Sequence, residues 1–191
     1  MVKLFKRFFV AVIIVSLLFS ACGCSYSDNT FRKNVKEKYS LVIPDTCRCV
    51  YANTDTWGGF PSVDGISYYI YEVGDSTDDF FSLFNTEADE FYVKCFNIWK
   101  DSMNGLLKHI TGEENVVSGD RLPDYSEQYL WCFRGVKGWN SSENCYDVGE
   151  TFDDIYDYYK QVYFTYIPKN GKMFAMHVVN YRLNEDIVNN Y

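Results

Sequence analysis

Seven cysteines are the side chains of this sequence best suited to chemistry, because a thiol can accept a lipid, form a disulfide, bind a metal or act as a nucleophile. They are Cys22, Cys24, Cys47, Cys49, Cys95, Cys132 and Cys145. Structural zinc takes two close cysteine pairs, or one such pair with two histidines. No second close pair follows Cys47 and Cys49. We therefore predict no metal site and no cofactor.

Cys132 and Cys145 flank a stretch without hydrophobic periodicity. A disulfide between them would close a loop of about 15 residues, which stabilises the folded state by about 3 kcal/mol in the chain-entropy model. Cys47 and Cys49 point to the same face of one predicted strand and cannot readily bond to each other. The sequence thus predicts Cys132–Cys145 as the candidate disulfide, and Cys95, on an apolar helix face, as a free buried thiol.

Neither histidine has a serine, cysteine or aspartate at a spacing typical of a catalytic pair. His177 falls in a predicted strand, and His109 falls near a helix end, where a cation favours the helix dipole. Aspartates cluster at 75–79 and 153–157, but neither cluster has the alternating ligands and terminal glutamate of a calcium loop. No catalytic residue is predicted, and a small extracytoplasmic hydrolase using carboxylates or a Cys/His pair is the alternative.

The turn Trp57-Gly58-Gly59-Phe60 is the local feature best suited to binding. Two glycines let the backbone approach a partner closely, and the flanking rings could stack on a sugar or a peptide side chain. Rings folded back onto the core are the favoured interpretation, and Trp57 and Phe60 are the candidate ligand contacts in the other one. Trp139 is a third ring predicted to lie in a loop.

The N-terminus has the three parts of a secretory signal peptide. Lys3, Lys6 and Arg7 precede an apolar run over residues 8–19 that is interrupted only by Ser16, and small residues follow. The run is too short to span about 30 Å of hydrocarbon as a helix. Residues 1–21 are therefore predicted to be a signal peptide and are left out of the fold.

The segment Leu18-Phe19-Ser20-Ala21-Cys22 resembles the lipobox of bacterial lipoproteins, in which the cysteine sulfur is joined to a diacylglycerol. The resemblance implies lipidation of Cys22, with Cys24 as the second choice. Two acyl chains hold a protein at a bilayer, whereas one binds only marginally. The expected location is the extracytoplasmic face of the cell membrane; plain secretion or an uncleaved anchor is the other interpretation.

The charge of the chain excludes several classes of partner. The net charge is −8, and cleavage before Cys22 would remove three of the 18 basic residues and leave −11. Nucleic acids and polyanionic wall polymers are bound through basic surfaces. We therefore expect no nucleic acid, and as partner either an envelope protein or a small ligand besides the bilayer itself.

The full chain is rich in apolar (47%) and aromatic (19%) residues, and its part after the signal peptide is predicted to form one globular domain. Residues 22–40 are predicted to form a tether and a lead-in helix through Phe31, Val35 and Tyr39, followed by a single domain over 41–191. Strands are predicted at 47–53, 66–73 and 129–134, and a surface loop at 135–150. Three- and four-residue steps predict one main amphipathic helix over Phe80–Ile98, as one helix or as two broken near Asn85, ending at Gly105 or Gly112.

The last two strands, 159–167 and 172–183, are joined by Asn170-Gly171, a strong hairpin signal. Pairing outward from that turn sets Ile167 opposite Phe174 and Phe164 opposite His177. Both faces of the hairpin carry apolar residues, so we expect it to lie centrally in a sheet that is covered on both sides. The fold class predicted is α+β, a mostly antiparallel sheet of about five strands with the main helix packed on it.

The lipobox, the turn Asp55-Thr56-Trp57-Gly58-Gly59-Phe60 with Asp64-Gly65 after it, and the tyrosine-rich closing hairpin together resemble a group of small, uncharacterised surface lipoproteins of Gram-positive bacteria. The resemblance implies a location and no known activity. The function predicted from the sequence is that of a membrane-anchored, non-enzymatic binding or interaction module. An accessory subunit of a transporter or signalling complex would differ from it only in its partner.

Overall fold

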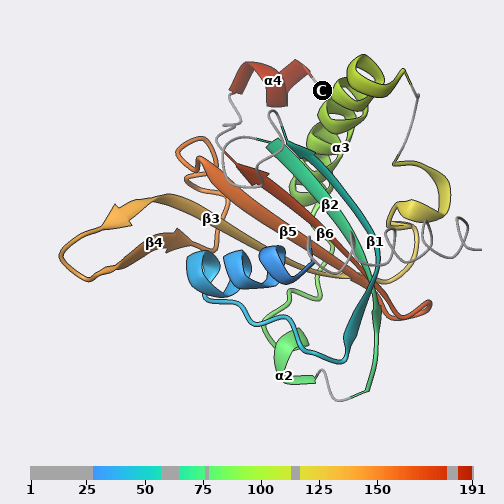
Figure 1. Ribbon diagram of the computed structural model, residues 1–191, viewed down its shortest axis with the longest axis horizontal. Helices are drawn as coiled ribbons and strands as arrows, with labels where there is room; N and C mark the ends of the chain where they lie inside the picture. Colours follow the sequence, from blue (N-terminus) through green and yellow to red (C-terminus); the bar gives the residue numbers. More distant parts are fainter. Residues whose placement is uncertain (1–27, 57–64, 76–77, 113–116, 180–184, 191) are drawn as a thin grey trace, which may run out of the picture.

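The computed structural model describes residues 28–56, 65–75, 78–112, 117–179 and 185–190. They form an α+β fold on an antiparallel sheet with the strand order β1-β2-β6-β5-β3-β4 (Figure 1). The predicted α+β class is confirmed, with six strands in place of about five. The strands are β1 (Cys47–Thr56), β2 (Gly65–Val73), β3 (Leu130–Asn140), β4 (Cys145–Gly149), β5 (Lys160–Ile167) and β6 (Lys172–Val179).

Helices in the described part of the chain lie on both sides of this sheet. The first, over residues 28–39, is called the N-helix here and runs across the front of the strands in Figure 1. The others are α2 (Asp78–Phe81), α3 (Glu90–Thr111) and α4 (Glu185–Asn190), with a 3₁₀ turn at Gly119–Arg121.

Two hydrophobic cores, one on each face of the sheet, follow from the two-residue alternation of the strands. On the α3 face, residues of α3 and α4 pack with sheet residues that include Tyr68, Phe133 and Tyr163. On the opposite face, called the N-helix face, the N-helix and α2 pack with sheet residues that include Tyr69 and Phe164. The hairpin β5–β6 lies at the centre of the sheet and is buried on both faces, as predicted.

The N-helix buries one side, formed by Phe31, Val35 and Tyr39 at four-residue steps. Each is at most 1% exposed, and burying a side chain of this size stabilises the fold by about 1.5–3 kcal/mol. The Phe31 ring stacks on Tyr69 with 4.1 Å between centroids. The predicted lead-in helix is therefore confirmed, and it forms part of the core.

Of the two alternatives predicted over Phe80–Ile98, the single helix is wrong and the pair of helices broken near Asn85 is confirmed, with the two helices on opposite faces of the sheet. Phe80 in α2 belongs to the N-helix face, whereas Ile98 in α3 belongs to the α3 face. Between them, Asn85 pairs with Trp131 through two backbone hydrogen bonds of 2.7 and 3.0 Å. Asp89 then caps α3, since its side chain accepts a hydrogen bond from the Tyr92 backbone N–H. Gly112, one of the two predicted ends, lies at the C-cap.

The β5–β6 register differs by two residues from the predicted one. Ile167 pairs with Lys172 and Phe164 with Ala175, so the connection has four residues. The N–H groups of Asn170 and Gly171 both donate to the Ile167 carbonyl, and Gly171 has a positive φ of 64°. A shift by two leaves every side chain on its predicted face, which is why the burial pattern was still predicted correctly.

Residues 135–150, predicted to be a loop, instead continue β3 and form β4, and this hairpin extends away from the rest of the sheet in Figure 1. Gly135 pairs with Gly149 at its base. The ring of Tyr158 fills the space that both glycines leave, and a Cβ on either glycine would overlap it. These glycines interrupt the hydrophobic alternation that is typical of a strand, so the hairpin was not predicted from the sequence.

The predicted Cys132–Cys145 disulfide is not formed, and both cysteines are thiols in the structure. Cys145 pairs with Asn140, at the far end of β3 from Cys132. Eight residues of strand separate Cys132 from Asn140, a distance of about 26 Å. A disulfide needs Cα atoms closer than about 7 Å, so the loop prediction and the disulfide prediction failed together.

The contact of Tyr158 with the hairpin base gives a first prediction. We expect Gly135→Ala to lower the free energy of unfolding by about 1–3 kcal/mol, because its Cβ would overlap the Tyr158 ring. Gly138→Ala in the same strand is the control. No atom lies within 4 Å of its new Cβ, so a change within about 0.5 kcal/mol is expected. Denaturant titration measures both, and equal losses in the two variants would contradict the packing described.

Candidate functional site

The site residues predicted from the sequence fall into two groups. Cys22, Cys24, Trp57 and Phe60 lie outside the described residues. Cys132 is buried in the N-helix face and Cys145 is exposed in β4, so they do not come together. The polar groups that the fold does bring together are others.

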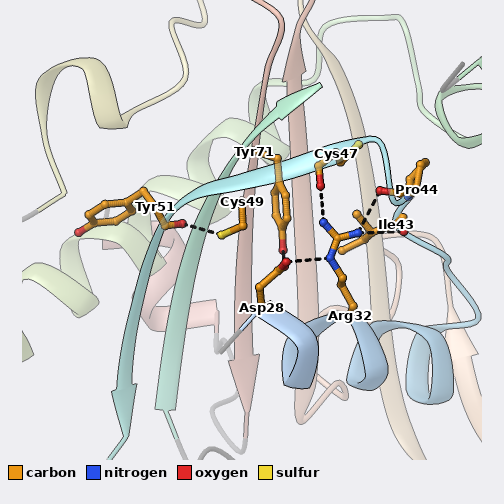
Figure 2. A network of polar contacts seen from close by, with 8 residues as sticks. All are labelled: Asp28, Arg32, Ile43, Pro44, Cys47, Cys49, Tyr51 and Tyr71. Atoms are coloured by element: carbon orange, nitrogen blue, oxygen red, sulfur yellow. Dashed lines mark hydrogen bonds and ion pairs between the residues drawn. The ribbon is translucent and has the colours of Figure 1, made fainter. Parts of the chain in front are cut away.

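Arg32 holds the N-helix to the chain that leads into β1 (Figure 2). Its Nη1 donates to the carbonyls of Ile43 (3.2 Å) and Pro44 (3.0 Å), and its Nη2 donates to the Cys47 carbonyl. Its Nε donates to the Asp28 carboxylate at 2.9 Å. Side-chain exposures of 18% for Arg32 and 15% for Asp28 make these charge-assisted bonds strong.

The same carboxylate also joins the N-helix to β2, because Tyr71 Oη donates to Asp28 Oδ1 at 2.6 Å (Figure 2). Burial raises the pKa of Tyr71, and the Asp28 charge raises it further, so the phenol stays a donor. Next to it on β1, the Cys49 thiol donates to the Tyr51 carbonyl at 3.3 Å. This network fixes where the N-helix lies on the sheet.

Three of the described thiols are poor nucleophiles at neutral pH. Burial raises the pKa of Cys47 and of Cys132 to about 11, and that of Cys95 to about 12. Only the thiolate attacks a substrate, and at pH 7 these groups are protonated.

His177 is a buried, neutral member of the N-helix face. It is 4% exposed, its Nε2 shares a hydrogen bond of 3.0 Å with Tyr39 Oη, and the two rings meet edge to face. Burial lowers the pKa of His177 to about 3, with smaller effects from the positive charges of Lys38 and Lys160. The histidine therefore joins the N-helix to β6, and two cations lie near it.

Those two cations and three rings form a surface called here the lysine–aromatic patch: Lys38, Trp139, Tyr146, Tyr159 and Lys160. Lys160 Nζ lies 4.8 Å from the Tyr159 ring centroid and 5.6 Å from that of Tyr146. Trp139 pairs with Tyr146 across the β3–β4 hairpin, with 4.9 Å between their rings. Trp139 is 53% exposed, so the patch is open to solvent on the hairpin side.

The carboxylates near the β3–β4 hairpin lie mainly on the face of the hairpin opposite to the lysine–aromatic patch. Lys137 pairs with Asp154 at 2.7 Å and lies over the Tyr158 ring, which belongs to the α3 face. Asp153 and Asp157 are exposed nearby. The hairpin thus separates an acidic face from a basic, aromatic one.

A hollow of about 360 Å³ lies at the N-terminus of α3, lined by residues 84–89 and Trp131. Its two side chains with printed hydrogen bonds serve the fold. Asp89 caps the helix, and Trp131 Nε1 donates to the Glu87 carbonyl at 2.8 Å. Nothing in this hollow points to a ligand.

Comparison of the chain with protein-family models, with curated proteins and with solved structures gives no match. Within the described ranges, no three His, Cys, Asp or Glu side chains are grouped so that they could hold a metal ion. None of the helices in these ranges is long and apolar enough to cross a membrane.

The lysine–aromatic patch was missed by sequence analysis except for Trp139, which was placed in a loop but kept as an available ring. Its members come from the N-helix, the β3–β4 hairpin and the start of β5. A local signal exists only in the pair Tyr159-Lys160, and the patch assembles through tertiary packing.

The burial of His177 predicts a pH dependence of stability. Its pKa in the folded state, about 3, lies below the ordinary 6.5, so between these values the unfolded chain binds one more proton. The stabilisation that this group provides is complete above pH 6.5. It decreases as the pH is lowered below that value, by up to about 1.4 kcal/mol per pH unit. We expect His177→Gln to remove this part of the slope measured by denaturant titration. His109→Gln, at an exposed position, is the control, and an unchanged slope in His177→Gln would refute the prediction.

Proposed function

We propose that this protein is a membrane-anchored lipoprotein on the extracytoplasmic face of the cell membrane, where it acts as a non-enzymatic binding module. The observation that carries the proposal is the N-terminal sequence, a basic start, a short apolar run and Leu18-Phe19-Ser20-Ala21-Cys22. A diacylglycerol on Cys22 would supply the attachment to the bilayer.

The length of the tether supports the anchoring half of the proposal. Asp28, the first described residue of the N-helix, follows Cys22 by six residues. Six residues reach at most about 20 Å when fully extended. The domain would therefore be held next to the bilayer surface, within reach of molecules of the envelope.

The exposed lysine–aromatic patch supports the binding half. Trp139 is among the large apolar side chains most exposed in the described part, and it projects from a hairpin that extends from the sheet (Figure 1). Exposed aromatic rings beside charges are typical of recognition surfaces. The net charge of −8 argues against nucleic acid as the ligand.

The alternative, a small extracytoplasmic hydrolase, has less support. A Cys/His mechanism needs a thiolate beside a base, whereas burial holds three thiols protonated and engages His177 with Tyr39. The binding module is the function that the described geometry favours.

Lipidation is tested by growing cells that express the full chain with labelled palmitate. The wild-type chain should take up label, Cys22→Ala should take up none, and Cys24→Ala, the matched control, should match the wild type. Label that persists in Cys22→Ala and disappears in Cys24→Ala would move the anchor to Cys24. Label in none of the chains would refute anchoring.

Binding is tested on the full chain purified from membranes in a mild detergent and weighed by native mass spectrometry. We expect a retained molecule with the wild type, its loss with Trp139→Ala, and its retention with Leu83→Ala, a control at an exposed apolar residue elsewhere. An absent adduct together with turnover of an envelope substrate would support the hydrolase instead.

A further inference from the structure

Lys38 and Lys160 are near enough on the N-helix face for their charges to interact, and neither forms an ion pair with an acid among the described residues. Seven described basic side chains form ion pairs with carboxylates: Arg32, Lys33, Arg48, Lys100, Arg134, Lys137 and Lys169. Lys38 and Lys160 form none of these pairs. Both are only half exposed, so neither charge is fully solvated.

Two acids, Glu37 of the N-helix and Glu150 directly after β4, are engaged with other cations. Glu37 lies 3.9 Å from Lys33 and has the smallest of the effects on Lys38. Glu150 pairs with Arg134 at 3.2 Å. Burial lowers the pKa of Lys38, and the charge of Lys160 lowers it further, which is the sign of two cations that repel each other.

The geometry of the sheet explains why the two cations are close. Lys160 pairs with Val179 in the register, and His177 is two residues before Val179 on the same face of β6. Tyr39, the neighbour of Lys38 in the last turn of the N-helix, hydrogen bonds to His177. The N-helix and the sheet are therefore joined at the place where both lysines lie.

Aromatic rings border the lysines on the hairpin side. Tyr159 and Tyr146 lie beside Lys160, and Trp139 packs edge to face against Tyr146. These rings limit the directions in which the Lys160 ammonium can find water. They also offer an exposed apolar surface next to it, through Trp139.

We propose that the lysine–aromatic patch binds a small organic anion, a carboxylate or phosphate carried on a ring, with the anionic group at Lys38 and Lys160 and the ring against Trp139 and Tyr146. An anion here would relieve the repulsion between two cations, and a ring would cover exposed aromatic surface. The ligand is small because a chain with net charge −8 repels a polyanion or an anionic bilayer at long range. The proposal deepens the binding half of the proposed function and does not depend on the lipid anchor.

Phenyl phosphate is the probe, titrated into the full chain in a neutral detergent and followed by calorimetry. The wild type should bind it saturably, and Lys38→Met and Lys160→Met should each weaken binding at least tenfold. Lys36→Met is the control, because it removes one positive charge from the same helix at a position two residues from Lys38 that lies outside the patch. It should leave the Kd for phenyl phosphate within twofold of the wild type. Trp139→Ala should weaken phenyl phosphate more than inorganic phosphate.

Three results would overturn the proposal. One is absence of saturable binding by the wild type, and the second is equal binding by the wild type and Lys38→Met/Lys160→Met. The third is lysine-dependent binding to phosphatidylglycerol vesicles without binding of phenyl phosphate, which would assign the patch to lipid headgroups. Each lysine variant is checked for a cooperative thermal transition. If the wild type does not bind phenyl phosphate but still retains a molecule in native mass spectrometry, the proposed anionic ligand is refuted and the binding module of the proposed function stands.

Discussion

The burial of β5 and β6 on both faces is the constraint on which the rest of the structure depends. From Gln161 to Thr165 and from Met173 to Val179 every residue is buried, so each face of these strands needs a cover. Helix α3 covers one face and the N-helix covers the other. A sheet covered on one side only would expose a row of large apolar side chains to water, at about 25 cal/mol per Å². The N-helix is therefore as necessary to the fold as α3.

Polar contacts decide where the N-helix lies on its face. Towards its N-terminal end, Arg32 donates to two carbonyls before β1 and to the carbonyl of the first residue of β1, and Asp28 accepts from Tyr71. At its last turn, Tyr39 meets His177. Hydrophobic contact alone is not directional, whereas hydrogen bonds at both ends set one position along the sheet. That position brings a helix lysine to a strand lysine.

Features encoded by neighbouring residues could be predicted from the sequence, and features that depend on distant packing could not. The hairpin signal at Asn170-Gly171 and the buried four-residue steps of the N-helix are local, and the hairpin and the helix were both predicted. The β3–β4 hairpin was missed because Gly135 and Gly149 make sense only with the Tyr158 ring between them. Over Phe80–Ile98 the sequence could not decide between one helix and two, because the periodicity of the apolar residues continues across a segment that passes from one face of the sheet to the other. The candidate site shares this limit, since its members come from three separate elements.

The contact between Tyr39 and His177 also has a consequence for the order in which the fold forms. The two residues are 138 positions apart, and β2 is paired with β6, whose strand begins about a hundred residues later. Pairings this distant in sequence slow folding, because a long loop must close before either contact forms. During synthesis, the N-helix and β2 emerge well before the strand that receives them. Neither of the two cores can be completed until β6 has left the ribosome. The nascent chain therefore stays incompletely folded, and accessible to chaperones, until its synthesis is nearly finished.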